Sequence, residues 1–340
     1  MPDQVAEYRR LLDRLTRVLL ITFGVWVAGF SLWGIYLAKP HEGLTTVDAL
    51  DIAQEARRLY RGEGLTTGFL KPAAILKQGG NPSPPDLYNS PAYVYALTIF
   101  FRIFGISEES VSGSSLFWAF SAGIFLFFFV FSRNGLPAAS AAFLLYAANP
   151  GVIEGAFSGL PYAFLSFLLL LLSLGIYHRR PGSLPWTAGL GVLSGLLYQT
   201  EFDYLFLAVV IYALVLAGSH SPRWKHGLVF LAAFALSSLP WWIRQVGVAG
   251  NPFFSLRWDD FRAYSDLFPA NRVARDFDPA ALAVRLPFVS WWDKVFRFLR
   301  LGCGYWLSLT YSLLSPLFLV SIFRPDFERR RRSAAVMAWA

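Results

Sequence analysis

The chain has 340 residues, of which 55% are hydrophobic and only 15% are charged. Soluble domains carry roughly a quarter charged residues, so the composition excludes an ordinary soluble domain. The net charge of +8 comes from short basic runs between apolar blocks. No basic stripe is interleaved with stacking aromatic residues, which argues against a nucleic-acid partner.

The apolar residues form blocks of the kind that cross a bilayer, which takes roughly 20 residues per helix. These blocks cover residues 18–38, 91–105, 114–132, 136–150, 157–177, 186–199, 202–217, 227–243, 296–320 and a stretch that begins at Ser333. We therefore expect an all-α polytopic membrane protein with one transmembrane domain over residues 1–340. The last block starts so near residue 340 that we expect the chain to be truncated at its C-terminus.

The distribution of basic residues predicts the topology. Arg residues cluster before the first block, which predicts a cytoplasmic N-terminus and an external loop over residues 39–113. The block at 91–105 has only about 15 residues, a length more typical of a re-entrant or interfacial segment than of a span. If it does not span, all later basic clusters become cytoplasmic and residues 245–295 form a second external loop. Eight complete spans result.

A small-residue pattern occurs in the block at 186–199. Gly191 and Gly195 are four residues apart in an apolar segment. This spacing is typical of membrane helices whose backbones approach closely, and it predicts tight packing against a neighbouring helix.

The first external loop contains a predicted amphipathic helix from about residue 46 to Arg61, ended by Gly62 and Gly64. Thr45 and Asp48 have the spacing of a capping box, which places Asp48 in the first turn. The free N–H groups there hold a carboxylate ionised and oriented. Asp48 is therefore a candidate general base, although an ordinary capping residue would show the same spacing.

Other acidic residues are expected on the same side of the membrane. Asp51 and Glu154 are candidates for a second acid, but Asp51 also fits a solvated helix face. Glu55 and Arg58 have the spacing of a surface ion pair. Glu201, at a span end, is a candidate substrate contact.

Two further segments complete the candidate site. Arg244 follows Pro240 and two Trp residues at the outer end of a span, where it either anchors the helix at the interface or holds a lipid phosphate. Tyr88 and Asn89 lie in a proline-rich loop that either lines a cavity and contacts substrate or serves only as a linker. The single cysteine, Cys303, and the scattered histidines predict neither a disulfide nor a metal site.

Several of these motifs together resemble the GT-C glycosyltransferases, which include the protein mannosyltransferases and the bacterial aminoarabinose transferases. The stretch from Asp48 to Leu65 resembles the start of that family's first external loop. Asn89 to Gly105 resembles its juxtamembrane segment. Pro240 to Arg244, followed by Gly-Asn-Pro-Phe at 250–253, is similar to its P-W-x-x-R and G-N-P-F motifs. The resemblance covers residues 15 to 255.

The resemblance implies a GT-C-like helix bundle with a large first external loop that contains interfacial helices. It implies an inverting transfer in which Asp48 deprotonates an acceptor and a polyprenyl phosphate leaves, with Arg244 on the phosphate. The donor would be a polyprenyl-phosphate-linked sugar, and the acceptor a glycan, lipid or protein. The excess of Arg over Lys suits a bacterial inner membrane. No separate cofactor is expected.

Two departures from the family pattern keep alternatives open. Tyr162 follows Pro161 where members often carry an acid, and Glu201 stands where many have Arg. The chain could therefore be a catalytically silent relative that serves as a scaffold in envelope glycan assembly. A transporter fits less well, because the acidic residues lie at span ends rather than near the bilayer midplane.

Overall fold

A computed structural model of the chain describes residues 18, 21–27, 29, 31, 44, 46–68, 85–177, 183–217 and 223–255. The predicted spans at 296–320 and from Ser333, and the second external loop beyond Ser255, lie outside the described residues. The named elements are α2 (Val47–Tyr60), α4 (Pro91–Phe104), α5 (Glu108–Ala147), α6 (Pro150–Phe157), α7 (Tyr162–Tyr177), α8 (Leu184–Thr200), η1 (Phe202–Tyr204), α9 (Leu205–Ala217) and α10 (Arg223–Ala249).

Two of the described helices, α5 and α10, are long and apolar enough to cross a membrane. Three shorter apolar helices, α4, α7 and α9, accompany them. Large apolar side chains are exposed on α10, as expected where a helix faces lipid rather than water. They include Leu228, Leu231, Leu236, Leu239, Ile243 and Val246.

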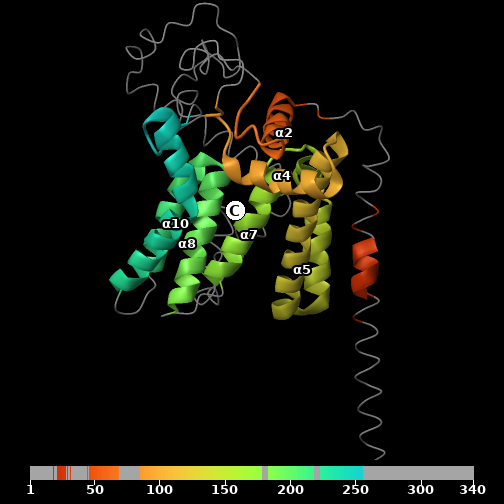
Figure 1. Cartoon of the computed structure of the whole chain (residues 1–340). Helices are drawn as coiled ribbons and strands as arrows, with labels where there is room; N and C mark the ends of the chain where they lie inside the picture. Colours follow the sequence, from red (N-terminus) through yellow and green to blue (C-terminus); the bar gives the residue numbers. More distant parts are fainter. Residues whose placement is uncertain are drawn as a thin grey trace, which may run out of the picture. The chain divides into compact units, whose positions relative to one another are not determined.

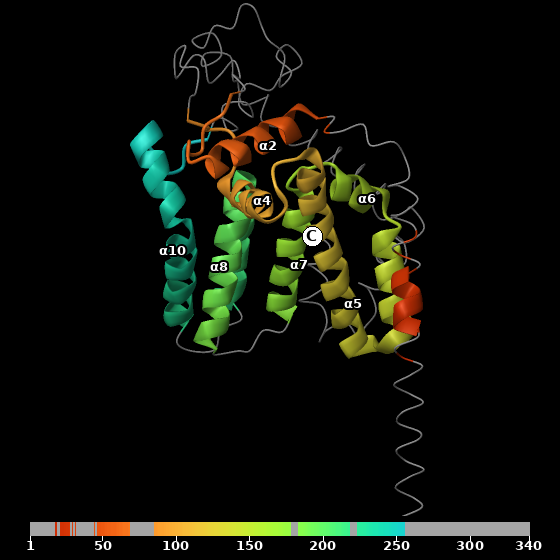
Figure 2. The ribbon, with the colours of Figure 1, turned by 45° about the vertical axis from the view of Figure 1, so that its right-hand side comes forward.

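The chain divides into two units, and the first comprises residues 1–49 and 107–174. Within it, α5 reverses direction at Gly135, whose φ of 78° and ψ of −179° suit a residue without a Cβ. This turn separates the two predicted blocks at 114–132 and 136–150. The halves pack side by side (Figures 1 and 2), and the Tyr146 hydroxyl donates to the carbonyl of Ala119 at 2.9 Å.

The second unit comprises residues 50–106 and 175–340, and its main contact is between α8 and α10. A Cβ added to Gly191 would meet the Phe230 carbonyl and Ala233, and one added to Gly195 would meet Ser237 and the Phe234 carbonyl. The predicted close packing through these glycines is therefore confirmed. The two helices run side by side in both views (Figures 1 and 2).

Enlarging one of these glycines should separate the helices. We expect Gly195→Leu to lower the melting temperature of the detergent-solubilised protein, because overpacking of a tight contact costs about 1–3 kcal/mol or more. Gly189→Leu is the matched control, since a Cβ at Gly189 meets nothing within 4 Å. Equal melting temperatures for the two variants would contradict this account of the α8–α10 contact.

Helix α4 has a different orientation from α8 in the same unit. Figures 1 and 2 show α4 lying across the end of α8 rather than alongside it. The Thr98 hydroxyl on α4 contacts the Ala56 carbonyl on α2 at 3.4 Å, which joins the two helices. On the opposite face of α4, Tyr95, Ile99 and Ile103 are exposed at i, i+4 and i+8. A helix that lies in the membrane interface presents an apolar face of this kind to lipid.

Candidate functional site

The start of α2 fixes the position of Asp48. The Thr46 hydroxyl accepts a hydrogen bond from the Ala49 backbone N–H at 3.3 Å, so Thr46 caps the helix. The expectation that Thr45 is the cap was therefore wrong by one residue, and Thr45 itself lies outside the described residues. Asp48 lies in the first turn, as predicted, and its side chain is half-buried. Its role as a base stays a prediction.

Asp51, one turn further along α2, is buried and only 1% exposed. The Thr67 hydroxyl donates to Oδ1 at 2.6 Å, and the Asn89 side-chain amide donates to Oδ2 at 3.0 Å. The alternative that Asp51 belongs to a solvated helix face was therefore wrong. Helical periodicity gave no sign of the two loops that cover this residue.

Glu55 and Asp86 form a second buried pair, at 2% and 2% exposure. Their carboxyl groups lie within hydrogen-bonding reach of each other. Burial, followed by the nearby Asp86 and Asp51, raises the pKa of Glu55 well above its ordinary value. Burial, followed by Asp51, also raises the pKa of Asp86, while backbone N–H donors from Tyr88 and Asn89 oppose the shift.

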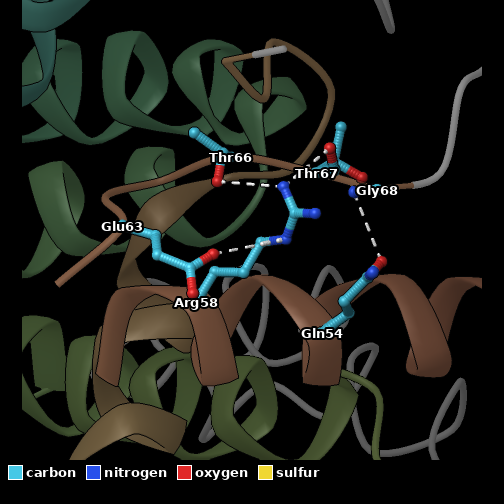
Figure 3. Close-up of polar contacts among 6 residues, drawn as sticks. All are labelled: Gln54, Arg58, Glu63, Thr66, Thr67 and Gly68. Atoms are coloured by element: carbon cyan, nitrogen blue, oxygen red, sulfur yellow. Dashed lines mark hydrogen bonds and ion pairs between the residues drawn. The ribbon is translucent and has the colours of Figure 1, made fainter. Parts of the chain in front are cut away.

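The predicted Glu55–Arg58 surface pair was wrong. Glu55 faces Asp86, and Arg58 instead holds the segment that follows the helix (Figure 3). Its guanidinium donates to the Thr66 hydroxyl and the Thr67 carbonyl at 3.3 Å each, and it lies 3.9 Å from Glu63. The nearby Gln54 side chain accepts from the Gly68 N–H at 3.3 Å (Figure 3). Together, these contacts hold residues 63–68 against α2.

Arg244 reaches the same segment from α10. Its Nη2 donates to the Leu65 carbonyl at 2.7 Å, and its Nη1 donates to Gln245 Oε1 at 3.2 Å. The guanidinium carbon lies 4.8 Å from the centre of the Trp241 ring, within cation–π range. Glu55 and Asp86 lie within electrostatic range of the cation. The unit therefore brings Arg244 close to the buried carboxyl groups of α2 and residues 85–90.

The structure places Tyr88 and Asn89 differently from each other. Asn89 is 3% exposed and its side-chain amide donates to Asp51, whereas Tyr88 packs against Leu87, a buried residue that Ala249 and Phe254 also contact. Asn89 therefore lies in the carboxyl cluster. Tyr88 belongs to a small apolar cluster around the neighbouring Leu87.

The other two predicted site residues lie elsewhere in the fold. Glu154 is exposed on α6 in the first unit, and Glu201 is the half-buried residue after α8, where its carbonyl accepts from the Tyr204 N–H at 3.1 Å. Their proposed roles remain untested.

Asp86 was not singled out as a candidate site residue in the sequence analysis. The available signal was its position in an Asp-Leu-Tyr-Asn turn directly before Pro91. The carboxylate accepts from the backbone N–H groups of Tyr88 and Asn89 at 2.9 Å each, a turn that Asp commonly forms. Within the described residues, no group of three His, Cys, Asp or Glu side chains is arranged to hold a metal ion.

Removal of Asp51 should loosen both segments that bond to it. We expect Asp51→Ala to destabilise the site by roughly 2–4 kcal/mol, because two buried donors lose their acceptor. Hydrogen exchange should then become faster in residues 62–68 and 85–90. Glu154→Ala, which removes an exposed carboxylate, is the control and should change neither segment. Unchanged exchange in Asp51→Ala would contradict the positioning role.

The sequence matches no protein-family model and no curated protein, whereas solved structures do resemble it. ArnT from Cupriavidus metallidurans bound to undecaprenyl phosphate aligns with a TM-score of 0.61 and 14% identity, over 94% of this chain and 53% of that one. Its apo state aligns with a TM-score of 0.56 and 13% identity, over the same shares. The chain thus spans about half the length of these proteins. The likeness establishes the fold: the chain shares the all-α helix bundle of these ArnT structures, as the sequence resemblance predicted.

Proposed function

We propose that the protein is an inverting glycosyltransferase of the inner membrane, with its N-terminus in the cytoplasm. It moves a sugar from a polyprenyl-phosphate-linked donor to a glycan, lipid or protein acceptor on the outer face. The observation that carries the proposal is the position of Arg244, a cation at the end of an apolar helix and next to the interfacial helix α2. ArnT, which shares the fold, binds undecaprenyl phosphate.

Exposure distinguishes the roles of the two aspartates on α2. Asp48 is half-buried and can be reached by an acceptor, whereas Asp51 is 1% exposed and both its oxygens already accept hydrogen bonds. We assign the general base to Asp48 and a positioning role to Asp51. This choice revises the sequence-based idea that Asp51 is a second acid. Glu154 remains a candidate for the second acid. Glu201 and Tyr88 remain candidate substrate contacts.

In the proposed reaction, Asp48 takes the proton of an acceptor hydroxyl as its oxygen attacks the anomeric carbon. The bond between that carbon and the phosphate oxygen breaks, and the electron pair leaves with the polyprenyl phosphate. A base of this kind contributes roughly 10²–10⁴-fold to a rate. The configuration at the anomeric carbon inverts, because attack and departure occur on opposite faces.

Arg244 would stabilise the charge that develops on the departing phosphate. A guanidinium has five N–H donors, and the described bonds of Arg244 engage one on each terminal nitrogen. Donors therefore remain for a phosphate at the headgroup level, where the planar fork of Arg matches phosphate oxygens. The Leu65 carbonyl and the Trp241 ring hold the side chain in place for this contact.

The proposal is tested with the full chain in liposomes that contain a polyprenyl-phosphate-linked sugar. We expect release of polyprenyl phosphate together with glycosylation of an added acceptor, and inversion at the anomeric carbon. A catalytically silent relative is the second candidate, since Tyr162 stands at a position where GT-C glycosyltransferases often carry an acidic residue. Tyr162 is 54% exposed. A donor that fails to bind, or that binds without turnover across acceptor classes, would favour that candidate over the transferase.

A further inference from the structure

Arg244 lies within electrostatic range of Glu55 and Asp86. It nevertheless forms no ion pair in the part of the chain that the structure describes. Its hydrogen bonds go to two neutral acceptors, the Leu65 carbonyl and Gln245 Oε1. The nearby Glu63 pairs with Arg58 instead. An Arg beside an ionised carboxylate normally forms a short, charge-assisted bond with it. The hydrogen-bond partners or the protonation states of these acids must therefore prevent an ion pair with Arg244.

The two aspartates are held by other partners. Asp51 accepts from the side chains of Thr67 and Asn89, and Asp86 accepts from two backbone N–H groups. These donors fix each carboxylate in its own segment. Asp86 is further satisfied by its hydrogen bond with Glu55. The remaining acid near Arg244 is therefore Glu55.

Glu55 has the surroundings of a neutral carboxylic acid. Its side chain is 2% exposed, and its Oε2 has no hydrogen-bond partner among the described residues. Two carboxyl groups can hydrogen-bond only if one of them carries a proton. An ionised Glu55 would be the third buried carboxylate in the cluster, with no donor for Oε2, and such a group is very costly to bury.

We propose that Glu55 is a positioning residue that acts as a neutral acid, donating its proton to Asp86 and so leaving Arg244 unpaired for a phosphate anion at the membrane surface. This inference rests on the proposed function. The titratable groups that interact electrostatically with Glu55 or Arg244 are Asp51 on α2, Asp86 before α4 and Tyr95 on α4. With Glu55 neutral, the guanidinium keeps its charge available. With Glu55 ionised, the cluster gains a negative charge beside the phosphate site.

The sign of the pH dependence follows from this arrangement. The pKa of Glu55 is raised in the folded protein, so protonation favours the folded site. This contribution is complete below the ordinary pKa of a glutamate and is lost as the pH rises through the raised pKa. Phosphate binding should weaken over the same pH range, because the newly ionised Glu55 competes for Arg244.

The first test measures the proton itself by infrared spectroscopy of the full chain in nanodiscs at neutral pH. We expect the carbonyl stretch of a protonated carboxylic acid that shifts when the glutamates carry ¹³C-carboxyl labels, and that is absent from Glu55→Gln. The labelled wild type shows by itself whether a glutamate holds a proton, and Glu55→Gln assigns the band to Glu55. Absence of a label-sensitive band, or a band that persists in a folded Glu55→Gln, overturns the proposal.

The second test measures the affinity of nanodisc-embedded protein for undecaprenyl phosphate. We expect Glu55→Gln to bind within about twofold of wild type at neutral pH, because the carboxamide is a neutral donor of the same shape. Binding at least about tenfold tighter would show that an ionised carboxylate near Arg244 had been removed, and would overturn the proposal. Binding tenfold weaker would overturn it as well.

The pH profile separates this role from a merely structural one. Wild-type affinity should fall across the pH at which the infrared band disappears, and Glu55→Gln should show no such fall. Parallel profiles would overturn the proposal. If the wild type does not bind undecaprenyl phosphate at all, the proposed function fails, while the infrared result still decides whether Glu55 holds the proton.

Discussion

Asp48→Asn should lower the rate of sugar transfer by roughly 10²–10⁴-fold while leaving donor binding unchanged. The carboxamide has nearly the same shape as the carboxylate but cannot accept the acceptor's proton. The first turn of α2 should persist, because Thr46 rather than Asp48 provides the side-chain cap. The measurement is single-turnover release of polyprenyl phosphate from a bound donor, with donor affinity determined separately.

Glu63→Gln is the matched control for this variant. Glu63 is an exposed carboxylate just after the same helix, and its described contact is the 3.9 Å pair with Arg58. An exposed pair of this kind contributes little to stability, so this variant should transfer sugar at the wild-type rate. Wild-type activity in Asp48→Asn would remove Asp48 from the mechanism. Loss of donor binding in that variant would show instead that the residue contributes to the donor site.

Arg244→Ala should weaken the binding of undecaprenyl phosphate by roughly 10- to 100-fold, because a hydrogen bond to a charged group contributes about 1.5–3 kcal/mol. The transfer rate should fall as well, since the departing phosphate loses its cation. Arg244→Lys should recover only part of the affinity, because a lysine cannot provide the planar fork or the same contact over Trp241. Equilibrium binding in nanodiscs measures both variants.

Two controls separate this role from a structural one. Arg102→Ala removes an exposed arginine from the last turn of α4, and it should bind the lipid as tightly as wild type. Hydrogen exchange at residues 65–67 reports whether loss of the Arg244 bond to the Leu65 carbonyl has freed that segment. If Arg244→Ala keeps wild-type affinity, or if Arg102→Ala loses as much affinity, Arg244 does not hold the phosphate.

The sequence by itself determined the class of the protein and much of its local structure. Long apolar blocks require a lipid environment, and the spacing of Gly191 and Gly195 predicted the close packing of α8 and α10. The capping pattern and the helical spacing of apolar residues predicted the helix at 47–60, and the glycines after it predicted where it ends. These features depend on residues near one another in the chain, so a local pattern is enough to reveal them.

Only the tertiary structure decided which acids are buried. Asp51 and Glu55 alternate with apolar residues in a way that also fits a solvated face, and the periodicity of α2 cannot show that residues 62–68 and 85–90 cover them. Arg244 reaches this region through its hydrogen bond to the Leu65 carbonyl, 179 positions earlier in the chain. The free energy of a buried carboxyl group depends on the donors and charges around it, and those come from segments distant in the sequence.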